Sequence, residues 1–200
     1  MKLVKFENIK TNRLLLRNLK LSDTEEYYKK IGGNEAVSKF MLWDTHKNVE
    51  ETKELVSSWV KMYGEPQFYK WAITLKETDE LIGIIQLLRF DEKENSCEVS
   101  YMISDSYWNK GYTTEALKAV LNFGFKKIKL DSVIADHYSE NIASGKVMLK
   151  AGMKYTGRVP DRFENVKGYK ELDCYKISKE DWDLISKKEK ISHDIYDFLY

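Results

Sequence analysis

A short polar turn around Gly111 contains the residue types that point most directly to chemistry. Residues 107–117 read YWNKGYTTEAL and lie between a predicted strand and a predicted helix. Gly111 supplies a backbone position that can take a positive φ or approach a ligand closely. The unpaired N–H groups of the following helical turn suit an anion such as a pyrophosphate, and Lys110 adds a positive charge. A plain strand-to-helix turn, capped by Thr113 or Thr114, explains the same residues without a ligand.

A second segment, residues 140–157, reads ENIASGKVMLKAGMKYTG and follows the rules for a short helix. Asn141 is a good N-cap residue, and the pair at 151–152, Ala-Gly, is typical of a helix end. The apolar residues that we expect to face inward are Ile142, Val147 and Leu149. These features need no ligand.

The elements that must position these segments follow from changes in hydrophobic period. Apolar residues recur at helical spacing over 48–63, which predicts an amphipathic helix. Three β-rich runs over 68–104, separated by short polar turns, predict an antiparallel meander. The elements expected after it are helix 112–127, strand 130–137, helix 141–151, strand 153–158, strand 169–177 and a short helix capped at 178–181. A strand, helix, strand order implies a parallel pair with a crossover, so the fold class is α+β, or mixed α/β, with one sheet flanked by helices.

Composition indicates an ordinary globular protein and excludes some partners. The chain has 200 residues, 42% hydrophobic and 32% charged, and we expect one domain over 1–186 with a C-terminal tail over 187–200. Its 33 basic and 32 acidic residues give a net charge of +1, which argues against a broad basic surface for nucleic acid. No apolar run reaches the ~20 residues of a membrane helix, and the charged start is unlike a signal peptide. We therefore predict a cytoplasmic protein with no membrane partner.

The cysteines and histidines show no metal-binding pattern. Cys97 and Cys174 form no zinc motif, and two free thiols are favoured over one disulfide. His46, His137 and His193 lack metal-ligand spacing, so we expect no metal. Neither cysteine has a histidine beside it in the sequence, which argues against covalent catalysis.

The turn around Gly111 resembles the pyrophosphate loop of the GNAT acetyltransferases, which reads Q/R-x-x-G-x-G/A and opens a helix. Trp108 stands in place of the glutamine or arginine, and Thr113 in place of the last glycine or alanine. The form W-x-K-G-Y-x-T-E-A, matched over residues 108–116, is familiar in the RimJ/RimL branch of that family. The departure at Thr113 places a bulkier side chain beside the phosphates.

Two further segments extend this resemblance over most of the chain. The pattern N-x-x-S-x-x-V-x-x-K-x-G-M, at residues 141–153, is similar to the GNAT segment beside the pantetheine arm. The opening T-N-R-L-x-L-R, at residues 11–17, is also similar to that branch. The motifs occur in the expected order on the expected elements.

The resemblance implies the GNAT fold, a central mixed sheet in which two parallel strands splay apart and acetyl-CoA lies between them. Those strands would be 96–104 and 130–137, and pantetheine amides would replace the missing ladder partners. Acetyl-CoA is the expected co-substrate. The cofactor-binding residues that the resemblance implies are Met102, Ile103, Ser104, Trp108, Asn109, Lys110, Gly111, Tyr112, Thr113, Thr114, Asn141 and Ser144.

The implied reaction is direct attack of a primary amine on the acetyl thioester, and the RimJ/RimL branch favours a protein N-terminal α-amino group. Such an amine has a pKa of about 7.7–8.0 and needs only a weak base. Glu98 is the expected catalytic base, acting through water, and Glu164 is its rival. Ser144 is the expected general acid for the thiolate, with Tyr138 as the alternative. A backbone N–H near Ile103 is the expected oxyanion donor.

Two other interpretations of the same residues stay open. In the first, the acceptor is a small amine such as a polyamine, an amino acid or an antibiotic. In the second, the chain is a non-catalytic acyl-CoA-binding module. His46, beside Trp43, is a candidate for the lining of the acceptor pocket. The resemblance implies a monomer or a homodimer.

Overall fold

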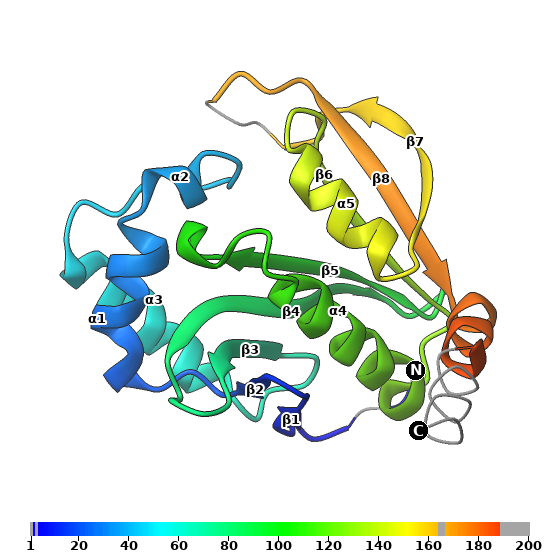
Figure 1. The fold of residues 1–200 in the computed structure, drawn as a ribbon, viewed down its shortest axis with the longest axis horizontal. Helices are drawn as coiled ribbons and strands as arrows, with labels where there is room; N and C mark the ends of the chain where they lie inside the picture. The colour runs from blue at the N-terminus through cyan, green and yellow to red at the C-terminus, as the bar shows by residue number, and fades with distance from the viewer. Residues whose placement is uncertain (1, 3, 164–166, 189–200) are drawn as a thin grey trace, which may run out of the picture.

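One sheet of eight strands forms the framework of the described part of the chain (Figure 1). The structure is a computed structural model and describes all residues except 1, 3, 164–166 and 189–200. The strand order is β1-β2-β3-β4-β5-β6-β8-β7. The strands are β1 Ile9–Lys10, β2 Leu14–Arg17, β3 Tyr69–Leu75, β4 Leu81–Asp91, β5 Ser96–Ile103, β6 Ser132–Tyr138, β7 Lys154–Pro160 and β8 Glu171–Ser178.

Helices connect these strands and cover both faces of the sheet. The α-helices are α1 Thr24–Tyr27, α2 Glu35–Ser38, α3 Val49–Met62, α4 Tyr112–Phe123 and α5 Ile142–Lys150, and residues 179–188 are also helical. The short 3-10 helices are Leu21–Asp23 and Asp105–Tyr107, and π-helical turns at Tyr28–Gly32 and Gly124–Ile128 continue α1 and α4. No helix among the described residues is long and apolar enough to cross a membrane.

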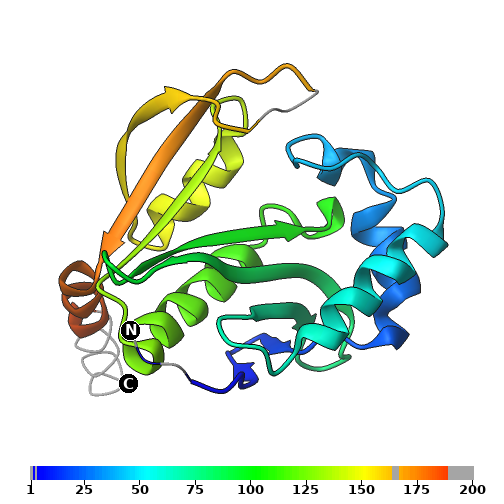
Figure 2. The same cartoon turned by 180° about the vertical axis from the view of Figure 1, so that it is seen from behind.

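The predicted mixed sheet with two splayed parallel strands is confirmed. Strands β2 to β5 pair antiparallel in sequence order. The parallel pairing of β5 with β6 covers only Ser96–Glu98 of β5, and its last pair joins Glu98 to Ile134. Beyond that pair the strands separate, and Figures 1 and 2 both show β6, β7 and β8 diverging from β5. The sheet therefore consists of two halves joined at one end of β5 and β6.

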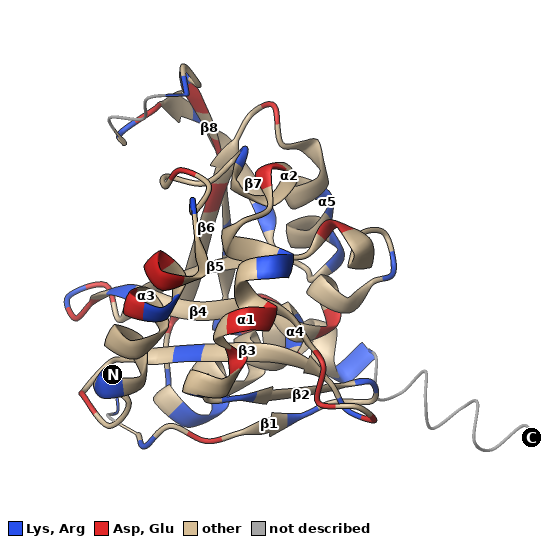
Figure 3. Ribbon diagram, turned by 90° about the vertical axis from the view of Figure 1, so that its left-hand side faces the viewer, with Lys and Arg blue, Asp and Glu red and all other residues tan. Residues whose placement is uncertain are grey.

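Two apolar cores hold helices on opposite faces of the sheet. The larger core places Val120 of α4 and Met148 of α5 against residues such as Trp71 and Val99. The smaller core joins Tyr27 and other residues of the α1–α3 region to Ala72 and Ile84. Figure 3 shows α1 and α3 in front of β3 and β4. Since side chains alternate along a strand, odd-numbered residues of β5 face α4 and even-numbered residues face the opposite side.

The exposed surface of α5 differs from the sequence expectation at two residues. Ile142 and Leu149 were expected to face inward, but they are 65% and 54% exposed. The buried residues of α5 are Gly145 and Met148, because the helix packs on the sheet through that stripe. Most of the expected C-terminal tail, residues 189–200, lies outside the described residues.

Candidate active site

The turn before α4 has the geometry of an anion site. Gly111 is the N-cap of α4 with a left-handed backbone at φ 79°, and Asn109 also has a positive φ of 59°. No side chain caps the helix, so the expected alternative of a cap by Thr113 or Thr114 is not observed. The first-turn N–H groups are left available to an anion, and the helix dipole adds to their attraction.

A clamp that the sequence did not reveal holds this turn. The carboxylate of Glu115 accepts hydrogen bonds from the Thr11 hydroxyl at 2.6 Å and from the Arg13 backbone N–H at 2.9 Å. The Arg13 guanidinium donates to Glu115 Oε2 at 2.7 Å and to the Lys110 carbonyl oxygen at 3.0 Å. It also lies 4.3 Å from the ring centroid of Tyr112. The T-N-R opening and the Glu of W-x-K-G-Y-x-T-E-A therefore contact each other. The presence of both motifs in one sequence was the signal from which this contact could have been predicted.

Trp108 braces the turn from the other side. Its indole N–H donates to the Ile103 carbonyl oxygen at 3.0 Å, so the segment that follows β5 is tied back to the end of that strand. The ammonium of Lys110 lies 5.1 Å from the ring centroid of Tyr107. The turn therefore connects β5 to α4 and lies beside the opening between β5 and β6.

The backbone at the end of β5 is only partly engaged by β4. The Ser104 N–H donates to the Ile82 carbonyl oxygen at 2.8 Å, and the Ser104 carbonyl oxygen accepts from the Tyr107 N–H at 2.9 Å. Both backbone groups of Ser104 are therefore already paired. Because backbone groups alternate in direction along a strand, the N–H of Ile103 faces away from β4, toward the gap. Of the expected residues Met102, Ile103 and Ser104, Ile103 is the one whose N–H is directed into the gap.

Ser144 lies at the start of α5 and contacts β5 across the opening. Its N–H donates to the side chain of Asn141, the N-cap, at 3.4 Å. The Tyr101 hydroxyl lies 2.9 Å from Ser144 Oγ and 3.0 Å from the Ser144 carbonyl oxygen. Burial raises the pKa of Tyr101, so its phenol stays neutral at physiological pH. Sequence reasoning had identified Ser144 and missed its partner Tyr101.

Gly145 lets α5 approach the sheet closely beside Ser144. A Cβ at this position would lie 2.7 Å from both His137 Nε2 and the Tyr175 hydroxyl. The His137 ring stacks on Tyr175 with centroids 5.5 Å apart. His137 therefore has a packing role under α5.

Glu98 lies at the last pair of β5 with β6, on the face opposite α4. It is 6% exposed, and its two oxygens accept hydrogen bonds from different arginines. Arg89 Nη1 lies 2.5 Å from Glu98 Oε1, and Arg162 Nη2 lies 3.3 Å from Glu98 Oε2. Arg162 also pairs with Asp136 of β6. The charged cluster of Arg89, Glu98, Asp136 and Arg162 closes the joined end of the gap and holds the carboxylate in one place.

Of the two alternative catalytic residues, Tyr138 is buried at the end of β6, and Glu164 is not among the described residues. Tyr138 ends β6 and is 4% exposed, and its hydroxyl has no hydrogen-bond partner among the described residues. Burial raises its pKa to about 12. Its ring stacks on Tyr169 at 4.7 Å. Glu164, the expected rival of Glu98, lies outside the described residues.

His46 supports the loop between α2 and α3. Its Nδ1 lies 2.6 Å from the Thr52 hydroxyl oxygen, and its ring lies beside Trp43 and Tyr27 at centroid distances of 5.3 and 6.5 Å. Burial lowers the pKa of His46, which favours the neutral ring. These contacts account for His46 without a ligand.

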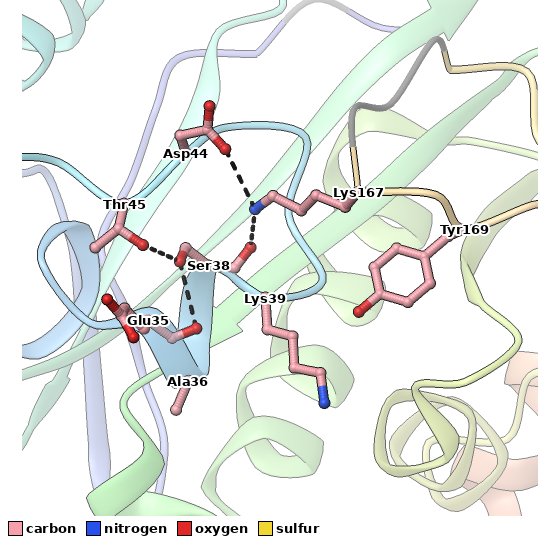
Figure 4. A pocket seen from close by; sticks show the side chains of 8 residues that line it. All are labelled: Glu35, Ala36, Ser38, Lys39, Asp44, Thr45, Lys167 and Tyr169. Carbon is pink, nitrogen blue, oxygen red and sulfur yellow. Dashed lines mark hydrogen bonds and ion pairs between the residues drawn. The ribbon is translucent and has the colours of Figure 1, made fainter.

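A cavity of about 550 Å³ opens between this loop and the segment before β8 (Figure 4). The Lys167 ammonium donates to the carbonyl oxygens of Ser38 at 2.5 Å and Trp43 at 2.8 Å. These two bonds connect the two halves of the sheet again, on the open side of the gap. The residues that line the cavity are Glu35, Ala36, Ser38, Lys39, Asp44, Thr45, Lys167 and Tyr169.

The two cysteines are free, as expected. Burial raises the pKa of the Cys97 thiol well above its usual range, which makes it a poor nucleophile. Among the described residues no three His, Cys, Asp or Glu side chains group as metal ligands, and His193 lies outside that part of the chain.

Known proteins are similar to this chain in sequence and in fold. Residues 13–154 match the family described as Acetyltransferase (GNAT) domain. The uncharacterized N-acetyltransferase YnaD of Bacillus subtilis is 29% identical over 178 residues, which are 88% of this chain and 99% of that protein. The crystal structure of a GNAT-family acetyltransferase from Bacillus anthracis aligns with a TM-score of 0.77 and 28% identity, over 87% of this chain and 99% of that one.

Two other proteins have names that state an acceptor. The ribosomal-protein-serine acetyltransferase of Escherichia coli is 26% identical over 108 residues, 54% of this chain and 59% of that protein. The spermidine N-acetyltransferase of Vibrio cholerae, solved with CoA and spermine, aligns with a TM-score of 0.72 over 86% of this chain and 99% of that one. At 17% identity the second likeness concerns the fold alone.

Proposed function

The chain belongs to the GNAT family and is an acetyl-CoA-dependent N-acetyltransferase, and we propose that its acceptor is a protein N-terminal α-amino group. The uncapped turn before α4, held by Arg13 and Glu115, supports binding of the co-substrate, and the RimJ/RimL form of its motif is the observation that favours an N-terminal acceptor. The likeness to a ribosomal-protein-serine acetyltransferase supports a protein acceptor.

The co-substrate is held, in this proposal, by groups on both sides of the gap. The N–H groups of the first turn of α4, with Lys110, bind the pyrophosphate. The N–H of Ile103 faces the acyl group, and Asn141 and Ser144 lie at the start of α5 on the opposite side. The acceptor amine then approaches from the face opposite α4, where Glu98 and the cavity near Lys167 lie.

The reaction forms one C–N bond and breaks one C–S bond. The neutral amine attacks the thioester carbonyl carbon, and the developing oxyanion accepts a hydrogen bond from the Ile103 N–H. Glu98 takes the proton of the amine through water, because each of its oxygens keeps a lone pair beyond its arginine contact. The Ser144 hydroxyl gives a proton to the leaving thiolate and regains one from solvent, and this help need only be small because a thiol has a pKa of about 8.5.

The first test is the thermal midpoint with and without acetyl-CoA. Ligand at 100 times its dissociation constant stabilises a native protein by about 2.7 kcal/mol. A clear shift in the wild type, lost in Gly111→Trp, is the expected result. A peptide panel with different first residues, compared with spermidine and free amino acids, then tests the acceptor. Turnover confined to small amines would contradict an N-terminal acceptor, and binding without any turnover would contradict catalysis.

A further inference from the structure

A buried lysine lies on the acceptor side of the sheet without an acidic partner. Lys70 of β3 is 6% exposed and faces the same side as Ala72, under α3. Its ammonium donates to Gln86 Oε1 and lies 4.1 Å from the ring centroid of Trp59. Among the described residues no carboxylate forms an ion pair with it. Burial lowers the pKa of Lys70 to about 8.

This arrangement is costly to stability, because a buried ammonium without a counter-charge loses its hydration. An apolar side chain of similar length would pack under Trp59 at lower cost. Such a group on the substrate side of a site is a candidate for function.

Lys70 fixes the orientation of Gln86. Because an ammonium only donates, the Gln86 side chain must turn its oxygen toward Lys70. Its amide nitrogen, with two N–H donors, then points the other way. Among the described residues this nitrogen has no hydrogen-bond partner of its own.

The direction of that amide nitrogen follows from the strand register. Gln86 of β4 pairs with Lys70 on one side and with Ser100 of β5 on the other. Ser100 follows Glu98 by two residues, on the same face and beyond the last pair of β5 with β6. With its oxygen turned toward β3, Gln86 directs its N–H groups toward β5, on the face of the sheet from which we propose that the acceptor amine approaches.

We propose that Gln86, held in one orientation by Lys70, binds an oxygen of the acceptor next to its reacting amine, so that the enzyme selects α-amino carbonyl compounds over polyamines. This inference rests on the proposed function and narrows its substrate class. In a peptide N-terminus, a carbonyl oxygen lies two bonds beyond the carbon that carries the amine. An alkyl polyamine has no such oxygen. The charge of Lys70 also disfavours a second ammonium nearby.

The decisive variant is Gln86→Glu. Its carboxylate still accepts from Lys70, and gives the lysine the counter-charge it lacks, but it has no N–H for the acceptor. We expect kcat/KM for a serine-initiated peptide to fall about tenfold or more, as on loss of a hydrogen bond to substrate. With spermidine, kcat/KM should rise, because a carboxylate attracts ammonium groups.

Lys70→Met provides a second variant, since it releases Gln86 and should lower the peptide-to-spermidine ratio in the same direction. Lys53→Met, on the exposed side of α3, removes the same charge and should leave that ratio unchanged. Each variant is checked for its thermal midpoint and for the shift produced by acetyl-CoA. An unchanged ratio in a folded, acetyl-CoA-binding Gln86→Glu protein overturns this inference alone. Absence of turnover with every amine overturns the proposed function, and this inference with it.

Discussion

Arg13 joins Glu115 to the turn that precedes it, because its guanidinium lies 2.7 Å from Glu115 Oε2 and 3.0 Å from the Lys110 carbonyl oxygen. The segment before β2 thereby holds the anion-binding turn in place. A Cβ at Gly111 would lie 3.4 Å from Arg13 Nη2, so the guanidinium also borders the turn itself.

Glu115→Ala should weaken acetyl-CoA binding. The change leaves the Thr11 hydroxyl and two donors of Arg13 without their acceptor, and the turn loses its support. We expect a loss of about 1 kcal/mol of folding stability, since Arg13 is 47% exposed, and a rise of about tenfold in Kd. Calorimetric titration with acetyl-CoA measures the second effect. Glu54→Ala on α3 is the control, and equal affinities in the two variants would contradict a role for the clamp.

Gly145→Ala should destabilise the protein and weaken co-substrate binding together. The new Cβ would meet His137 Nε2 and the Tyr175 hydroxyl at 2.7 Å, so α5 or these two packed side chains must shift. Overpacking of this kind costs about 1–3 kcal/mol. Urea unfolding provides the measurement, with the exposed Lys146→Ala on the same helix as control. Unchanged stability would show that α5 does not need this close approach.

Glu98→Gln should lower kcat/KM for a peptide by about 10²-fold or more near pH 7. The amide cannot take the proton of the amine, although it can keep one arginine contact. At pH values above the amine pKa of about 8 the acceptor is already neutral, so the deficit relative to wild type should shrink. A pH profile of both proteins checks this. A deficit that is constant with pH would indicate that Glu98 only organises Arg89 and Arg162.

Ser144→Ala should lower kcat by about tenfold with little change in KM, since a thiolate leaves with little assistance. Tyr101→Phe keeps the ring and loses the hydroxyl that contacts Ser144 Oγ at 2.9 Å. Its effect should be smaller, and the double variant should be no worse than Ser144→Ala, because both changes act on one hydroxyl. Additive effects would mean that the two residues act separately.

Lys70→Met should stabilise the protein at pH 7. Burial lowers the pKa of Lys70 from 10.5 to about 8, so between these values the unfolded chain binds more protons than the native protein. The unfolding free energy of the wild type therefore rises with pH over that window, and the penalty is fully present below pH 8. At about 1.36 kcal/mol per pKa unit the penalty is about 3 kcal/mol, and the gain in the variant is smaller than this because the contacts with Gln86 and Trp59 are lost. In urea unfolding, the difference in unfolding free energy between Lys70→Met and the wild type should be smaller at pH 10 than at pH 7. Lys53→Met should show no such dependence on pH.

The local features of the site were predictable from the sequence alone. The turn at Gly111, the N-cap at Asn141 and the antiparallel meander depend on contacts within a few residues, so their residue types and spacing are enough to indicate them. The resemblance of the motifs to a known family supplied the splay of β5 from β6, which no periodicity would have shown.

Only the tertiary structure decided which distant residues meet. Arg13 and Glu115 are far apart in the chain, and the pairing of Lys70 with Gln86 depends on the register of two strands. The exposure of Ile142 likewise depends on which stripe of α5 the sheet covers. Local spacing carries no information about such contacts, because they are set by strand order, register and burial once the whole chain has folded.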